Sequence, residues 1–378
     1  MTSLKFRLAY RNLFHDRLRF IATIVGIIFS IVLVTVQMGL YVGFRRMVTT
    51  MIDHSPAALW IIPTGTKCFE DPSLLDDRQR FRALAVNGVA EATPLVIGYA
   101  QWRLPGGTTT PVFIVGSELQ ELGLHPWNLV AGRMDDLSIP GAVAIDQSYF
   151  ERLGVSGTGE NAEIRDQKVQ VAAVTKGIRS FTTTPYVFTD VDRARAYTGT
   201  SPNKASYLVV RLSADADAYA VRQQLRASLP NVEVLTASEF RNRSRSFWLF
   251  GTGAGAALFA GALLGFIVGT VIVAQTLYSS TKDHLNEFAT LRAIGSSSTY
   301  IYTVIIWQAL LNAVIGFCGA AAIGAIVVRM TAESALPIVM TPALTFALFV
   351  LTVVMCVASA IAAIVQVMRI DPTLVFTR

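Results

Sequence analysis

Long stretches without a charged residue dominate the pattern of this chain. Three of them are longer than the roughly 20 residues that an α-helix needs to cross the hydrocarbon core of a bilayer: 20–42, 247–280 and 300–328. A fourth stretch, 334–368, contains Pro337 and Pro342, so its helix is expected to begin near Ala343 after a short turn. The pattern predicts four transmembrane helices, one before and three after a long polar block.

That block, residues 48–245, has the pattern of a folded domain. Short apolar runs rich in β-branched residues are typical of strands and recur at 111–116, 142–145, 169–174, 186–188 and 207–212. Residues 216–229 place apolar side chains near one helical face, and Pro230 ends the run. Because a structureless loop of this length is improbable in a compact protein, we expect a large mixed α+β extracytoplasmic domain inserted between transmembrane helices 1 and 2.

These patterns assign every part of the chain. We expect a cytoplasmic amphipathic amino-terminal helix at 1–19, transmembrane helix 1 with an outer extension at 20–47, the extracytoplasmic domain at 48–245, transmembrane helix 2 at 246–280, a cytoplasmic coupling hairpin at 281–298, transmembrane helix 3 at 299–329, a short outer loop at 330–342, transmembrane helix 4 at 343–368 and a cytoplasmic tail at 369–378.

Charge fixes the expected orientation. With 52% hydrophobic and 15% charged residues the chain is more apolar than an average soluble protein. The distribution of its net charge of +6 is therefore used to predict its orientation in a membrane. Five cations precede the first apolar stretch: Lys5, Arg7, Arg11, Arg17 and Arg19. Cytoplasmic segments carry such an excess, and four crossings place both termini on one side, so we expect both termini in the cytoplasm. No basic stripe interleaved with aromatic residues indicates nucleic-acid binding.

The familiar catalytic motifs are missing from the sequence. It contains no GxxxxGK[ST] phosphate loop, HExxH, GxSxG or paired CxxC motif. The three cysteines have no metal-ligand spacing, and the four histidines are scattered. We therefore expect no catalytic residue, no metal site and no cofactor bound by this chain, and a membrane-anchored enzyme is the weakest of the possible functions.

Small residues recur at four-residue spacing inside the apolar stretches. Such ridges let helix backbones approach closely in lipid, and the candidates for helix packing are Gly39, Gly43, Gly261, Gly265, Gly269, Gly316 and Gly324. The spacing leaves open whether the packing partners lie within one chain or in a second copy.

Residues 281–298 form the most distinctive polar segment. Its charged residues alternate with apolar ones at helical spacing: Lys282, Asp283, Glu287 and Arg292 with Leu285, Phe288, Leu291 and Ile294. The pattern predicts an amphipathic helix ended by Gly295. Its apolar face needs lipid, the chain's own helices or a partner to cover it. A solvated connector is the alternative, although a connector needs only a few polar residues.

At this point the chain resembles a known family. Residues 287–295, with the sequence EFATLRAIG, resemble the signature of the MacB/FtsX-like permeases, the membrane subunits of mechanotransmission-type ABC transporters. Residues 8–13 (LAYRNL) and 369–372 (RIDP) are similar to the family's first helix and usual ending. Within the family, residues 26–27, 37–40 and 59–61 resemble the DevC-like subgroup.

The resemblance implies a function in the bacterial inner membrane. It implies a homodimeric permease with a periplasmic domain, served by two copies of an ABC ATPase subunit that bind ATP and Mg²⁺. Unlike MacB, this sequence carries no fused ATPase domain. DevC-like members work with a membrane fusion protein and an outer-membrane channel to expel hydrophobic or amphiphilic compounds. The alternative is an FtsX-like signalling subunit that activates a cell-wall hydrolase, but its outer domain is usually smaller, which favours export.

Two groups of residues are candidates for function within this scheme. In the hairpin, the residues expected to couple to the ATPase are Lys282, Asp283, Glu287, Phe288, Leu291, Arg292 and Gly295. At the outer membrane face, five arginines flank helices 1 and 2 as a basic collar: Arg45, Arg46, Arg241, Arg243 and Arg245. The ordinary explanation of the collar is anchoring to lipid phosphates; the functional one is attraction of an anionic amphiphile.

Overall fold

The computed structural model describes residues 2–15, 17–71, 73–119, 122–283, 298–332, 334 and 336–368. The chain forms two compact units. The helical unit comprises Met1–Gly43, Ala256–Ala332 and Pro337–Arg378, and the sheet unit comprises Phe44–Gly255 and Glu333–Leu336.

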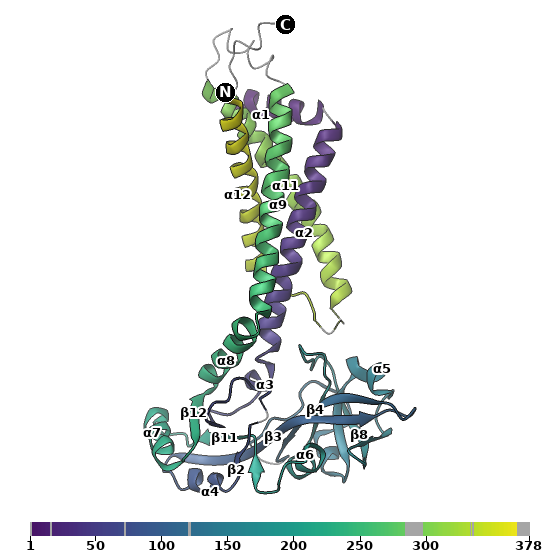
Figure 1. Cartoon of the computed structure of the whole chain (residues 1–378), viewed down its shortest axis with the longest axis vertical. Helices are drawn as coiled ribbons and strands as arrows, with labels where there is room; N and C mark the ends of the chain where they lie inside the picture. Colours follow the sequence, from purple (N-terminus) through teal and green to yellow (C-terminus); the bar gives the residue numbers. More distant parts are fainter. Residues whose placement is uncertain are drawn as a thin grey trace. The chain divides into compact units, whose positions relative to one another are not determined.

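The helical unit contains the membrane-crossing helices. Its helices are α1 (Thr2–His15), α2 (Arg17–Met47), α9 (Ala254–Asp283), α11 (Ser298–Thr331) and α12 (Pro342–Met368). Among the described residues, α2, α9, α11 and α12 are long and apolar enough to cross a bilayer, with mean hydropathy between 2.2 and 2.8. These four helices run alongside one another (Figure 1) and confirm the four that the sequence predicts.

Glycines set how closely these helices pack. A Cβ atom on Gly269 of α9 would lie 2.6 Å from Ser30 Cβ on α2 and 2.7 Å from Met355 Sδ on α12. Gly316 of α11 lies equally close to Ile27 of α2. The remaining candidates contact other segments of the same chain: Gly39 meets Ile338, Gly43 meets Pro337, Gly261 meets Gln37, Gly265 meets Leu33 and Val34, and Gly324 meets Thr35. In lipid, where the hydrophobic effect does not drive helices together, such close contact supplies much of the attraction.

The sheet unit is built on a mixed ten-stranded sheet of the described residues. Its strands run in the order β12-β1-β11-β3-β4-β9-β6-β8-β5, with β7 pairing with both β3 and β8. They are β1 (Leu59–Pro63), β3 (Val89–Arg103), β4 (Thr109–Ser117), β5 (Leu129–Ala131), β6 (Ala142–Asp146), β7 (Asn161–Ile164), β8 (Gln167–Thr175), β9 (Tyr186–Asp190), β11 (Tyr207–Leu212) and β12 (Val232–Thr236). The pairs β4–β9 and β6–β8 are parallel, and a separate two-stranded sheet joins β2 (Leu75–Asp76) to β10 (Lys204–Ala205).

Short helices lie among these strands. They are α3 (Thr50–Asp53), α4 (Gln79–Leu84), α5 (Phe150–Leu153), α6 (Val191–Thr198), α7 (Ala218–Ser228) and α8 (Ala237–Ser246), with a π-helical turn η3 at Phe247–Gly251 and 3₁₀ turns η1 (Met134–Ser138) and η2 (Gln147–Tyr149). The five strands and the helix that the sequence predicts correspond to β4, β6, β8, β9, β11 and α7 and are confirmed. The sequence did not single out β1, β3 or β12.

Both faces of the sheet are buried around β1. Along β1, Leu59 and Ile61 belong to one hydrophobic cluster, whereas Trp60 and Ile62 belong to another. Successive side chains of a strand point to opposite faces, so a strand covered on both faces reads as a continuous apolar run without alternation. The longest strand, β3, pairs with β11, β4 and β7 and joins the halves of the sheet.

The second membrane helix differs from the expected continuous helix at 246–280. The helical backbone is interrupted between η3, which ends at Gly251, and α9, which begins at Ala254. Gly253 adopts a left-handed conformation with φ of +75°, which favours glycine. A Cβ on Gly255 would lie 2.5 Å from the Leu249 carbonyl oxygen, so the backbone leaves no room for a side chain at this position. The helix expected to be continuous over 246–280 is therefore divided before Ala254.

The glycine contacts predict a matched pair of variants. Gly269→Ala places a methyl group against the Ser30 Cβ, and overpacking of this kind costs about 1–3 kcal/mol. Gly324→Ala is the control, because its Cβ meets Thr35 Cγ2 at 3.4 Å, an ordinary contact distance. Thermal unfolding of the purified chain in detergent should show a lower Tm for Gly269→Ala alone. Equal Tm values for the two variants would contradict close packing at Gly269.

Candidate functional site

The chain enters the sheet unit at Phe44 and leaves it at Gly255, and the segments next to these two points pack together. We call this region, formed by the end of α2, α3, the loop at Cys68–Asp71, α8 and η3, the root of the sheet unit. Ser244 of α8 is fully buried there. Its hydroxyl donates to the Val48 carbonyl at 3.1 Å and lies 3.5 Å from the Phe69 amide nitrogen, which donates to it. Arg241 forms an ion pair with Asp53 of α3. Entry and exit are thus bonded to each other.

Aromatic contacts join the same two segments. Phe181, from the loop after β8, packs edge-on against Phe44 with ring centroids 5.2 Å apart and against Trp248 of η3 with centroids 4.5 Å apart. Phe181 is buried. Aromatic pairs in this geometry contribute about 0.5–1.5 kcal/mol beyond the area they bury. One side chain of the sheet unit therefore bridges the last turns of α2 and the turn η3.

A buried carboxyl group lies beside this bridge. Glu70 accepts hydrogen bonds from the Trp248 indole nitrogen at 2.9 Å and from the Tyr186 hydroxyl at 3.4 Å. Burial raises the pKa of Glu70 to about 7, and the bonds from Trp248 and Tyr186 only partly oppose this shift. The charge of Glu70 therefore changes near neutral pH.

The loop that carries Glu70 is tied to the sheet. The hydroxyl of Tyr207 on β11 lies 3.2, 2.8 and 2.9 Å from the carbonyl oxygens of Cys68, Phe69 and Asp71. Burial raises the pKa of the Cys68 thiol to about 12, so this cysteine is protonated and unreactive. Among the described residues no group of three metal-ligating side chains occurs. In the described part of the root, this loop therefore carries a carboxyl group whose charge changes near neutral pH and a protonated thiol.

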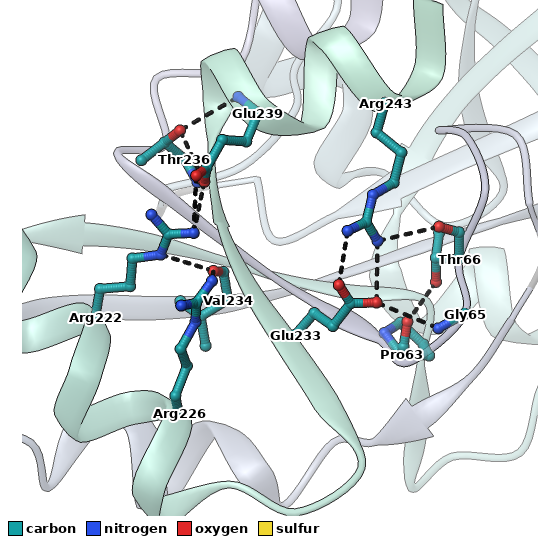
Figure 2. Close-up of polar contacts among 10 residues, drawn as sticks. All are labelled: Pro63, Gly65, Thr66, Arg222, Arg226, Glu233, Val234, Thr236, Glu239 and Arg243. Carbon is teal, nitrogen blue, oxygen red and sulfur yellow. Dashed lines mark hydrogen bonds and ion pairs between the residues drawn. The ribbon is translucent and has the colours of Figure 1, made fainter. Parts of the chain in front are cut away.

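Ion pairs brace α8 on the strands beneath it (Figure 2). Arg243 of α8 binds both carboxylate oxygens of Glu233 on β12, at 3.0 and 2.6 Å. It also donates to the Thr66 carbonyl at 3.3 Å, just beyond β1. The hydrogen bond from Arg243 lowers the pKa of Glu233. Both side chains are about one-third exposed. A bidentate pair of this kind fixes geometry better than a single contact does.

The start of α8 is fixed by a reciprocal cap, also visible in Figure 2. The Thr236 hydroxyl accepts from the Glu239 amide at 3.2 Å, and the Glu239 carboxylate accepts from the Thr236 amide at 2.9 Å. Arg222 of α7 then pairs with Glu239 at 2.7 Å. The sequence TASE at 236–239 is a capping box, which satisfies amide groups that the first helical turn leaves unpaired. α8 is consequently fixed by the cap at its start, by the ion pair of Arg243 and by the hydrogen bonds of the buried Ser244.

The five arginines of the collar have different surroundings in the structure. Arg241 and Arg243 have carboxylate partners within the chain, which makes them part of the framework of the root. Arg45 and Arg46 are exposed in the last turn of α2. Arg245 lies on α8, one turn beyond Arg241. The exposed pair on α2 is thus the part of the collar that faces outward.

The coupling residues lie at the limit of the described chain. Lys282 is exposed and Asp283 is the last residue of α9, whereas Glu287, Phe288, Leu291, Arg292 and Gly295 lie outside the described residues. The sequence did not point to Glu70, Trp248 or Phe181. No motif marks them, because their proximity depends on folding that brings together positions up to 178 residues apart.

Glu70 predicts a pH dependence of stability. The folded protein holds the Glu70 proton more tightly than the unfolded chain, where the pKa is near 4.5. The resulting stabilisation is complete below pH 4.5 and is lost as the pH rises through about 7. At 1.36 kcal/mol per pKa unit it amounts to about 3 kcal/mol. The Tm of the wild type should fall from pH 5 to 8 relative to that of Glu70→Gln. Exposed Glu151→Gln is the control, and parallel Tm curves for wild type and Glu70→Gln would contradict the assignment.

Comparison with known proteins identifies the family. The family model of the MacB-like periplasmic core domain matches residues 20–228, and that of the FtsX-like permease C-terminal domain matches residues 248–372. No curated protein matches the chain.

One solved structure similar to part of this chain is the periplasmic region of MacB from Actinobacillus actinomycetemcomitans. The two sequences are 12% identical, and the TM-score is 0.39. The match covers 50% of this chain and 94% of that chain. The extracellular domain of the noncanonic ABC-type transporter YknZ from Gram-positive bacteria is 15% identical, with a TM-score of 0.36 over 48% of this chain and 99% of that one. With a MacB-like core domain and an FtsX-like permease domain in succession, the chain belongs to the MacB/FtsX-like family of ABC transporter permeases.

Proposed function

We propose that this chain is the permease subunit of an ABC exporter. Two copies form a homodimer in the bacterial inner membrane, with both termini in the cytoplasm and the sheet unit in the periplasm. Two copies of a separate ATPase subunit bind ATP and Mg²⁺ and supply the energy. A membrane fusion protein and an outer-membrane channel complete the path for a hydrophobic or amphiphilic compound, as in DevC-like members.

The root is the observation that carries the proposal. Val48 and Ser244 are hydrogen-bonded, Asp53 and Arg241 are ion-paired, and Phe181 contacts both Phe44 and Trp248. A displacement of the segment at either end of the sheet unit is therefore passed to the other end and to the sheet. Such a device suits a permease that converts movement of its helices into rearrangement of a periplasmic domain.

Identification of the cargo and of the partners comes first. We expect the chain, expressed with the products of its neighbouring genes and purified in detergent, to retain an ATPase, a membrane fusion protein and an amphiphilic compound detectable by mass spectrometry. Recovery of the ATPase together with a cell-wall hydrolase, without a bound compound, would instead indicate the signalling function and would overturn the export proposal.

The hairpin at 281–298 is the proposed docking point for the ATPase. At helical spacing Glu287, Phe288 and Leu291 share one face, and Asn286 lies on the opposite face. The double variant Glu287→Lys, Phe288→Asp should abolish stimulation of ATP hydrolysis by the permease in reconstituted vesicles, because it reverses a charge and polarises the apolar face. Asn286→Lys should retain it. Unchanged ATP turnover and export in the double variant would disprove docking at this face.

The bridge at Phe181 predicts uncoupling. Phe181→Ala removes the ring that contacts Phe44 and Trp248 but leaves the cytoplasmic segments intact. We expect it to keep ATP hydrolysis near the wild-type rate while lowering export of the co-purifying compound. Phe250→Ala, which truncates an exposed ring on η3, is the control and should export normally. Loss of export in both variants, or in neither, would rule out a specific role of the bridge.

A further inference from the structure

A groove of about 370 Å³ lies within the helical unit along α11. Its lining on α11 begins at Phe317, ends at Arg329 and recurs every three or four residues, so it follows one helical face over about 18 Å. Ile31 and Thr35 of α2 form one wall, and Met340 and the start of α12 form the other. The volume falls within the range of about 300–1,000 Å³ that is typical of small-molecule sites.

The groove opens where the packing of α2 against α11 loosens. Gly316 and Gly319 press against Ile27 and Ile28, and a Cβ on Gly319 would lie 2.6 Å from Ile28 Cδ1. At Gly324, farther along α11, the nearest atom of α2 would be 3.4 Å away. The two helices are therefore packed more closely at Gly316 and Gly319 than at Gly324, where the distance is that of an ordinary contact.

Three polar side chains occur in this mainly apolar lining: Thr35, Thr345 and Arg329. Thr35 is 4% exposed, and the Thr345 hydroxyl donates to the Thr341 carbonyl at 3.2 Å. Arg329, in the last turn of α11, is exposed and has no carboxylate partner in the described part of the chain. A cation at the rim of an apolar groove attracts an anion. The groove thus offers an apolar channel with one positive charge at its end.

We propose that this groove binds an acyl chain of an anionic membrane lipid, with the acidic head group of the lipid at Arg329. The helices that form the groove cross the bilayer, so lipid chains are the molecules that surround it. Charge complementarity selects an acidic head group over a zwitterionic one, and the Thr35 hydroxyl can donate to an ester oxygen of the lipid. The proposal holds whether the transporter exports or signals, because it concerns a lipid bound beside the helices.

Ordinary snorkelling of an arginine toward the membrane surface also places a cation at a helix end. Snorkelling requires no groove. A larger side chain that fills the groove should therefore reduce lipid binding only if the lipid lies in the groove. Ala325 lines the groove and is exposed, which allows a larger side chain without disturbing the core. Ala322 is an exposed residue of α11 outside the lining and serves as a matched control.

Native mass spectrometry of the full chain in detergent, with equal amounts of phosphatidylglycerol and phosphatidylcholine carrying the same acyl chains, tests the proposal. We expect a single retained lipid per chain, with phosphatidylglycerol preferred about fivefold, as one arginine near the surface provides. Arg329→Gln should abolish the preference, whereas Arg46→Gln, a loss of equal charge outside the groove, should preserve it. Ala325→Phe should reduce the binding of both lipids, whereas Ala322→Phe should leave it unchanged.

Three results would overturn the lipid site. The wild type could retain no lipid, the two arginine variants could lose the preference equally, or the two phenylalanine variants could bind lipid alike. If Ala325→Phe instead separated a lipid-free dimer into single chains, a second copy of the chain would be the occupant of the groove. Size-exclusion chromatography and Tm of each variant establish that it is folded, so that lost binding is assigned to the site.

Discussion

The sheet unit is inserted between two membrane-crossing helices, and the hydrogen bond between Ser244 and Val48 fixes the distance between its two ends. The ion pair of Arg241 with Asp53 and the contacts of Phe181 surround that bond. A buried hydroxyl with both a donor and an acceptor partner tolerates little displacement, since each lost bond leaves a polar group unpaired. The root consequently holds the entry and exit segments of the sheet unit together.

The sheet supports the root because it is itself covered on both faces. Alternate residues of β1 belong to different hydrophobic clusters. Trp60 packs with Tyr207 and with Phe240 of α8, whereas Leu59 and Ile61 face the other side of the sheet. Tyr207 in turn holds the loop of Glu70. Force that reaches α8 therefore enters the centre of the sheet through buried aromatic rings. A close-packed interior of this kind transmits displacement instead of absorbing it.

The bilayer imposes a different constraint on the helical unit. Because lipid is as apolar as the helices, their association depends on close contact, and Gly269 and Gly316 permit it where Ser30 and Ile27 intrude. The same logic applies beside the groove, where α2 and α11 approach more closely at Gly316 than at Gly324. Just before α9, Gly253 adopts a left-handed conformation and interrupts the helical backbone.

The sequence by itself determined the four membrane helices, the inserted mixed domain and the family, because apolar length, β-branched runs and the segment at 287–295 are local properties of the chain. It also marked the glycines, since their spacing is a helical period. Only the tertiary structure decided that these glycines meet partners within one chain, that Arg241 and Arg243 belong to ion pairs, and that the helix expected at 246–280 is interrupted before Ala254. Glu70, Phe181 and Trp248 depend wholly on tertiary structure: each is an ordinary residue in its own segment. Only burial against distant segments gives Glu70 its raised pKa and makes Phe181 a bridge.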